Sequence, residues 1–455
     1  MSSNNRIKEQ IQFCIRGELW DKLLPLLEKL HPADIADVIE DAPDDVQNQI
    51  FELLDDETKA NVIAELGDST EAEILDELTV EEISGIAEEM APDDAADMLA
   101  ELDKKLSTEV LNLMEQEDSE DVRELLRYEE DTAGGRMTTD FVALPETATV
   151  KEALMHIGAL ELDEPIYFAY VVNQTNVLTG YVQIWQLLKT GNRQKTLAEL
   201  AEENTLTVTP DTDQETVARI MSKYDLSSLP VIDAKGHLLG RVTVDDIIDV
   251  LEEEASEDLF KLAGSDDIEL EDPSPFSSCK TRLPWLMVTL ASGFISSLIL
   301  KRFVENPHII MLSSFVPIIM AMGGNTGIQS SILIVRGLAV GSFDQSKLVR
   351  LLWHEVLTGM MMGLVCGVVI GIWAHIMVGN SGQLSALYLA STVGLALFCA
   401  MMFAAAFGAF VPLLLNRFKV DPAVAAGPFV TASNDVIAVL IYYAITFLMI
   451  ISRVT

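Results

Sequence analysis

The residues of this 455-residue chain best suited to chemistry are carboxylates, and one of them stands alone. Asp435 lies well inside a long apolar stretch near the C-terminus. In a membrane, an ionisable group at such a place costs several kcal/mol unless it faces water or a partner. Carboxylates with bound water are usual ligands of Mg²⁺. Asp435 is therefore a candidate cation ligand. The alternative is a structural ion pair or hydrogen bond, although the sequence offers no evident basic partner at that depth.

The other candidate carboxylates form three groups in the first 260 residues. They are Asp93, Asp94 and Asp97; Asp213, Glu215 and Asp225 with Asp246; and Glu254, Glu257 and Asp258. Spacings of three or four residues place members of a group on one face of a helix. Two such faces repel each other unless cations lie between them, so divalent cations would draw them together. For any single carboxylate, a solvated helix face is the alternative interpretation.

Charge is distributed very unevenly along the chain. Residues 1–272 hold 66 of the 71 Asp and Glu residues but only 20 of the 30 Lys and Arg residues. This acidic part excludes nucleic acid as a partner, because phosphate backbones require basic side chains, and it would be repelled by anionic lipid. Cations are its natural partners. The segregation also excludes a single soluble globule.

The four cysteines show no short pairing, which argues against a disulfide framework or a zinc site. The polar segment 1–12 lacks the apolar run of a signal peptide. We therefore expect the acidic part to lie in a reducing cytosol.

The C-terminal part predicts a membrane domain. Five apolar stretches each exceed the length of about 20 residues that a helix needs to cross a bilayer. They are residues 284–303, 309–336, 352–378, 384–415 and 423–451. With the N-terminus inside, seven Lys and Arg residues flank the cytoplasmic ends and three the outer ends, which favours a cytoplasmic N-terminus.

The acidic part predicts two further domains and a connecting helix. Residues 1–135 show helical periodicity, and a repeat relates Pro32–Asp37 to Pro92–Asp97, which predicts an all-α helical-repeat domain. Residues 136–255 contain two copies of a small α/β unit, at about 136–197 and 198–255, with a hairpin turn at Asp233–Gly236. Residues 245–280 continue as an acidic connecting helix and linker.

Three motifs together resemble one family. Leu229–Asp246 looks like a cystathionine-β-synthase (CBS) domain, and the first α/β copy is a more degenerate version. Thr132–Thr138 (Thr-Ala-Gly-Gly-Arg-Met-Thr) resembles the joint between an acidic helical domain and a CBS pair. The third motif is Pro317–Ser330, which includes Gly-Gly-Asn-Thr-Gly-Ile-Gln. Together with Asp421-Pro-Ala and Gly427–Asp435, it resembles the pore helices of MgtE-type magnesium channels.

The resemblance implies a multidomain membrane protein with a transmembrane bundle of five helices per protomer over residues 281–455. It also implies a homodimer in the lipid bilayer of the plasma (inner) membrane, with a pore on the twofold axis that conducts Mg²⁺ and closes when its cytosolic domains bind Mg²⁺. Asp435, Asn325 and Gly324 would then be pore ligands, with close helix packing as the alternative for the glycines. The regulatory ligands would be Asp93, Asp97, Asp213, Glu215, Asp225, Asp246, Glu254, Glu257 and Asp258.

CBS pairs often bind adenine nucleotides such as ATP. Thr243 and Asp246 have the Thr-x-x-Asp spacing that can hold a ribose, and the same residues can equally cap a helix.

The sequence gives little support for an enzyme, because it lacks Walker A, Gly-x-Ser-x-Gly and His-Glu-x-x-His motifs. Two other classes remain. One is a secondary divalent-cation transporter coupled to H⁺ or Na⁺, with Asp435 as the coupling carboxylate. The other is a CBS-type sensor with a passive membrane anchor.

Overall fold

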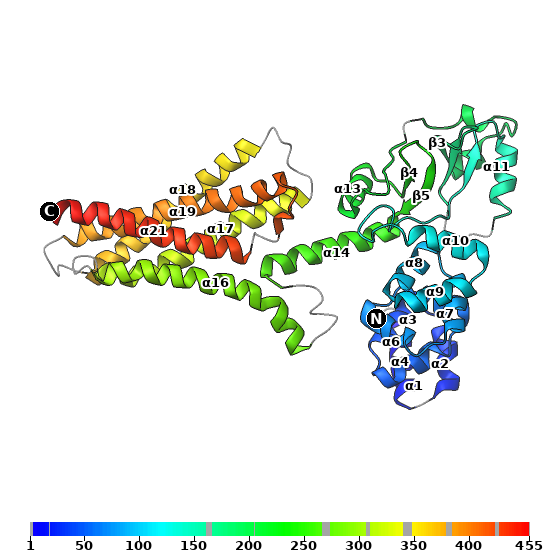
Figure 1. Ribbon diagram of the computed structural model, residues 1–455, viewed down its shortest axis with the longest axis horizontal. Coiled ribbons are helices and arrows are strands. Elements are labelled where there is room, and N and C mark those ends of the chain that lie inside the picture. The colour runs from blue at the N-terminus through cyan, green and yellow to red at the C-terminus, as the bar shows by residue number, and fades with distance from the viewer. Residues whose placement is uncertain are drawn as a thin grey trace. The chain divides into compact units, whose positions relative to one another are not determined.

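The computed structural model describes residues 3–17, 19–160, 166–203, 205–265, 274–305, 310–339, 348–378, 385–423 and 427–454. The chain divides into two compact units, Met1–Glu252 and Glu253–Thr455 (Figure 1). Each unit is described by itself.

Among the residues that the structure describes, the first unit begins with ten short helices. Their bounds are α1 Ser3–Arg16, α2 Trp20–Leu27, α3 Pro32–Glu40, α4 Asp44–Phe51, α5 Asp56–Ile63, α6 Asp68–Leu75, α7 Val80–Glu88, α8 Pro92–Glu101, α9 Lys104–Leu113 and α10 Gln116–Leu125. Both α3 and α8 start with proline at the first turn, as the matching segments Pro32–Asp37 and Pro92–Asp97 predict. Side chains cap other helices: Asp55 accepts from the Thr58 N–H at 2.9 Å, and Thr79 forms a capping box with Glu82.

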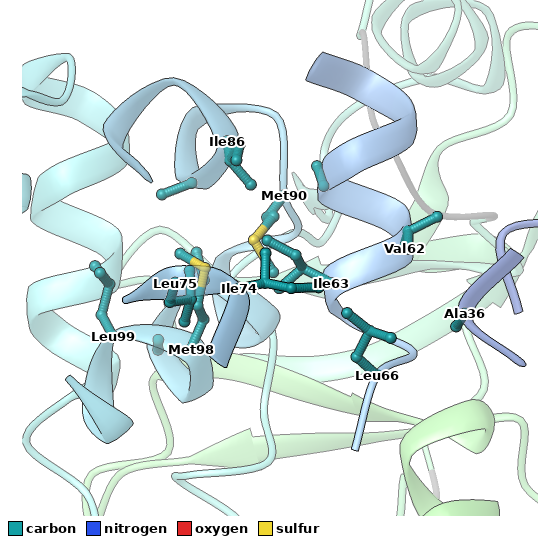
Figure 2. Close-up of a cluster of buried hydrophobic side chains, with 14 of the residues drawn as sticks. Ala36, Val62, Ile63, Leu66, Ile74, Leu75, Ile86, Met90, Met98 and Leu99 are labelled. Carbon is teal, nitrogen blue, oxygen red and sulfur yellow. The ribbon is translucent and has the colours of Figure 1, made fainter. Parts of the chain in front are cut away.

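These helices are too short to be stable alone, so their apolar faces must pack together. Figure 2 shows Ile63, Ile74 and Met90 pointing toward one another in the core of this domain. Ile63 and Ile74 are each 1% exposed. The predicted stack of short helices is confirmed.

The α/β part of the first unit contains two sheets within its described residues. Its elements are β1 Ala143–Pro145, α11 Val150–Ile157, β2 Phe168–Val172, β3 Leu178–Gln183, α12 Ile184–Lys189, η1 Leu197–Glu199, α13 Gln214–Tyr224, β4 Ser228–Ile232 and β5 Leu238–Thr243. Strand β1 pairs in parallel with β2. Strand β2 pairs antiparallel with β3, and β4 pairs antiparallel with β5. A parallel bridge between Val208 and Val231 repeats in the second copy the pairing of Leu144 with Val171 in the first. The predicted duplication is therefore present.

Helix α14 (Val244–Ala263) contributes to both units. Ile247 and Val250 are buried in the core of the first unit. The helix is followed by Gly264, whose φ of +73° is a left-handed conformation that suits glycine after a helix C-terminus. Residues 266–273 of the predicted linker lie outside the described part of the chain.

The second unit contains, after the end of α14, a bundle of long apolar helices. Their bounds are α16 Pro275–Val304, η2 Ile310–Phe315, α17 Val316–Ala339, α18 Leu348–Val378, α19 Ala386–Arg417 and α21 Pro428–Val454. Within the described residues five helical segments are long and apolar enough to cross a membrane, which confirms the predicted number. Helices α18 and α19 approach closely, since a Cβ on Gly367 would lie 2.6 Å from the Gly394 carbonyl oxygen.

Candidate functional site

Asp435 lies two turns into α21 and is partly exposed at the surface of the bundle. The opposing residue on α17 is Gly324. A Cβ on Gly324 would lie 3.0 Å from Asp435 Oδ1 and 3.3 Å from Thr431 Cγ2. The missing side chain thus leaves room for the carboxylate. Among the described residues no Lys, Arg or His forms an ion pair with Asp435. The structural ion pair considered as its alternative role is therefore not found in the described part of the protein.

The neighbouring Asn434 points to the interior of the bundle and is 1% exposed. A Cβ on Gly327 of α17 would overlap the Asn434 Nδ2 atom, and a Cβ on Gly408 of α19 would overlap the Gly327 carbonyl oxygen. Neither polar atom of the Asn434 amide has a hydrogen-bond partner among the described residues. Three helices therefore meet with almost no side chain between them, and this contact fixes the rotation of α21 that leaves Asp435 at the surface.

The other residues of Gly323–Gly327 differ in burial: some pack against neighbouring helices and Asn325 is exposed. A Cβ on Gly323 would lie 2.9 Å from the Ala438 Cβ, so Gly323 and Gly327 serve close helix packing. Asn325 is exposed at the surface of the bundle. Asn325 and Asp435 can thus both be reached from outside the single chain.

In the first unit, Arg136 brings together carboxylates that are far apart in sequence. Its Nη1 atom lies 3.7 Å from Asp97 Oδ2. Burial raises the pKa of Asp246 and of Asp249, and the charge of Arg136 counteracts that rise in both. A guanidinium therefore already lies among acidic residues of α8 and α14. Asp93, on the same helix as Asp97, is 5% exposed.

The second predicted group is not assembled within one chain. Asp213 is the N-cap of α13 and accepts a hydrogen bond from the Thr216 N–H at 3.2 Å. Asp225 follows the end of the same helix in a left-handed conformation, with φ of 52°. The two carboxylates are therefore separated by the whole of α13, about 16 Å at 1.5 Å per residue. Glu215 lies in the first turn, near Asp213.

Among the described residues, no three His, Cys, Asp or Glu side chains converge closely enough to hold a metal ion. The acidic groups are therefore not preassembled metal centres.

Thr243 and Asp246 bond to each other at the start of α14. The Thr243 hydroxyl donates to Asp246 Oδ2 at 2.6 Å, and the Thr243 N–H donates to the same oxygen at 3.3 Å. The helix-cap interpretation of the Thr-x-x-Asp spacing is thus realised.

The last turns of α14 carry the third acidic group next to a lysine. The Lys261 ammonium contacts Glu257 and lies 2.8 Å from Asp421 Oδ2. Burial alone would lower the pKa of Lys261, but its hydrogen bonds to Asp421 and Glu257 outweigh burial and raise it. Burial raises the pKa of Asp258, and the nearby charge of Asp421 adds to that rise.

One carboxyl that the sequence did not single out is buried within the helical domain. Glu71 on α6 is 9% exposed. Burial, reinforced by the charges of Glu101, Asp68, Asp97 and Asp94, raises its pKa to about 8.

Three segments match known families. Residues 30–131 match the MgtE intracellular N domain, residues 197–253 match the CBS domain, and residues 316–445 match a divalent cation transporter family, MgtE. The magnesium transporter MgtE of Enterococcus faecalis is 37% identical over 330 residues, which cover 71% of this chain and 70% of the relative. The chain belongs to the MgtE family of magnesium transporters.

Two further MgtE proteins are similar over the same extent. That of Thermus thermophilus is 37% identical and covers 72% of each chain, and that of Bacillus subtilis is 35% identical and covers 70% of each. A crystal structure of the cytosolic domain of the Mg²⁺ channel MgtE in complex with ATP is 34% identical, with a TM-score of 0.51 over 53% of this chain and 99% of that one. This MgtE-family protein is thus a membrane transporter and not an enzyme.

Sequence reasoning missed residues whose partners are remote. Lys261 and Asp421 are 160 positions apart, and Gly327 and Asn434 are 107 apart. The sequence features that could have pointed to the pairing of Lys261 with Asp421 are a lysine within an acidic helix and the position of Asp421 in the motif Asp421-Pro-Ala.

Proposed function

We propose that this protein is a Mg²⁺-selective channel that mediates magnesium uptake. The observation that carries the proposal is Asp435, a carboxylate on a membrane-spanning helix, partly exposed beside Gly324 and with no ion-pair partner in the described residues. A carboxylate in such a place needs water or a cation. Mg²⁺ keeps its octahedral water shell and is commonly bound through one or two carboxylates.

The pore forms on the twofold axis of a homodimer. Asp435 and Asn325 lie at the surface of the single bundle, where a second copy can present the same residues. Two Asp435 carboxylates then face one hydrated ion, with Asn325 and the Gly324 carbonyl as further oxygen ligands. The N-terminus lies in the cytoplasm and the bundle in the plasma membrane, in line with the distribution of Lys and Arg at the ends of the spans.

The cytosolic part closes the pore when Mg²⁺ is plentiful. It comprises the helical domain 1–135, the CBS pair 136–255 and the connecting segment 245–280, and residues 281–455 form the pore domain. Mg²⁺ bound by the nine regulatory carboxylates of these segments screens the repulsion between acidic faces. By linkage, the closed state must bind Mg²⁺ more tightly than the open state.

The CBS pair binds ATP or a related adenine nucleotide. A relative's cytosolic domain is described in complex with ATP. Thr243 bonds only Asp246 Oδ2, so in the described part of the chain Asp246 Oδ1 keeps a lone pair for a ribose hydroxyl.

The test of the pore is Asp435→Asn, which keeps the shape of the side chain and removes its charge. We expect Mg²⁺ flux into liposomes to fall at least 100-fold. Ser433→Ala, two residues away on the same helix, is the matched control and should retain flux within twofold. Flux of Asp435→Asn equal to that of the wild type would exclude Asp435 as the pore ligand. If flux instead follows an imposed H⁺ or Na⁺ gradient, the protein is a secondary transporter and Asp435 its coupling carboxylate.

A further inference from the structure

The end of α14 is joined to the segment before α21 through Lys261. Its ammonium bonds Glu257 one turn earlier on α14 and Asp421 in the connection between α19 and α21. Asp421 is itself held, because its Oδ1 accepts the Ala423 N–H at 2.8 Å. The side chains of Lys261 and Asp421 are 29% and 37% exposed, so the contact is partly shielded from water.

The backbones at this junction lie too close together for intervening side chains. A Cβ on Gly427 would overlap the Leu262 carbonyl oxygen, and a Cβ on Gly264 would lie 2.8 Å from Pro428 Cγ. Leu262 also packs against Ala423. A displacement of the end of α14 must therefore displace the first turn of α21, the helix that carries Asp435.

The charges at the junction nearly balance, and Lys261 is central to that balance. Glu257, Asp258 and Asp421 are acidic, and besides Lys261 the basic group that acts on Asp258 is Arg336. Without the ammonium, three carboxylates would face one guanidinium. Their mutual repulsion would then loosen the contact unless another cation replaced Lys261.

We propose that Lys261 is a tethered cation that joins the connecting helix to the pore helix α21 and competes with regulatory Mg²⁺ for Glu257, so that it sets the Mg²⁺ concentration at which the pore closes. This inference rests on the proposed function of Glu257 as a sensor ligand. An ammonium brings one charge, and Mg²⁺ brings two and prefers carboxylate oxygens. The Lys261 ammonium contacts Oε1 of Glu257, so Mg²⁺ that binds this carboxylate competes with the ammonium for its negative charge.

The first test is Lys261→Met, which keeps most of the unbranched side chain and removes its charge. In the full-length protein in liposomes, the Mg²⁺ concentration that halves the flux should fall three- to tenfold. Lys261→Arg should stay within twofold of the wild type, as should Lys280→Met, which removes an exposed charge of the same unit that lies outside the contacts of Lys261 with Glu257 and Asp421. An unchanged or increased half-closing concentration for Lys261→Met would overturn the proposal.

For the second variant, Asp421→Asn, we expect the half-closing Mg²⁺ concentration to change in the opposite direction. The amide keeps the Oδ1 cap on Ala423 but no longer attracts the ammonium, so Lys261 is left to Glu257 alone. Mg²⁺ then competes with a stronger contact, and the half-closing concentration should rise at least twofold. A fall, as for Lys261→Met, would show that total charge and not competition governs closure.

Hydrogen exchange tests the junction without a measurement of flux, so it distinguishes a failure of this inference from a failure of the proposed function. In Mg²⁺-free buffer, amides of residues 257–265 should exchange at least fivefold faster in Lys261→Met than in the wild type, and Mg²⁺ should restore their protection. That result supports the junction even if wild-type flux proves insensitive to Mg²⁺, which would refute only the proposed gating. Equal exchange in both proteins without Mg²⁺ would refute the junction itself.

Discussion

The buried carboxyl of Glu71 makes the stability of the helical domain depend on pH. Its pKa is about 8 in the folded protein, against 4.5 for an unperturbed glutamate. The unfolded chain therefore loses this proton first as pH rises, and the folded state keeps it. The stability that Glu71 contributes is fully present below pH 4.5 and declines until about pH 8.

The size of the effect follows from the difference of 3.5 between the two pKa values. At ~1.4 kcal/mol for each unit, it amounts to at most about 5 kcal/mol. This is comparable to the whole stability of a small domain. The glutamine of Glu71→Gln cannot ionise, so this variant should retain above pH 8 the stability that the wild type loses.

The assay is hydrogen exchange of residues 68–101 in the full-length protein without Mg²⁺, with each variant compared with the wild type at the same pH. Glu71→Gln should match the wild type at pH 5 and be protected at least tenfold more at pH 8.5. Glu73→Gln is the control, because Glu73 is exposed on the same helix. A Glu71→Gln profile parallel to that of the wild type would refute the assignment of a neutral, buried Glu71.

Three further results are expected. Gly327→Ala should reduce Mg²⁺ flux at least tenfold because its Cβ overlaps the Asn434 amide, and adding Asn434→Ala should restore part of the flux; no rescue would locate the defect elsewhere. Thr79→Ala should lower the melting temperature of the helical domain, by loss of about 1 kcal/mol from the capping box, with flux unchanged. Deletion of residues 1–255 should leave Mg²⁺ flux that no longer stops at millimolar Mg²⁺, whereas normal closure would place the gate in the membrane domain.

Local patterns in the sequence predicted the elements well. Apolar length predicted five spans, and the turn Asp233–Gly236 predicted the hairpin of β4 and β5. Ends were less accurate: α16 begins at Pro275, nine residues before the predicted span, because the polar turn that precedes the apolar run is also helical.

Contacts between distant segments could not be predicted in the same way. Periodicity shows which face of a helix is buried but not which residue lies opposite. The sequence therefore identified Asp435 but not its contact with Gly324, and it grouped Asp213 with Asp225 although a complete helix separates them. The pairing of Lys261 with Asp421 likewise depends on how α14 meets the bundle.

The central claim is that Asp435 lines a channel that Mg²⁺ itself closes. Patch-clamp recording of the full-length protein in liposomes, with Mg²⁺ as the permeant cation, tests it most directly. We expect unitary currents that stop as Mg²⁺ rises on the side of the acidic domains. Absence of currents, together with Mg²⁺ uptake driven by a proton or sodium gradient, would contradict the claim and identify a carrier.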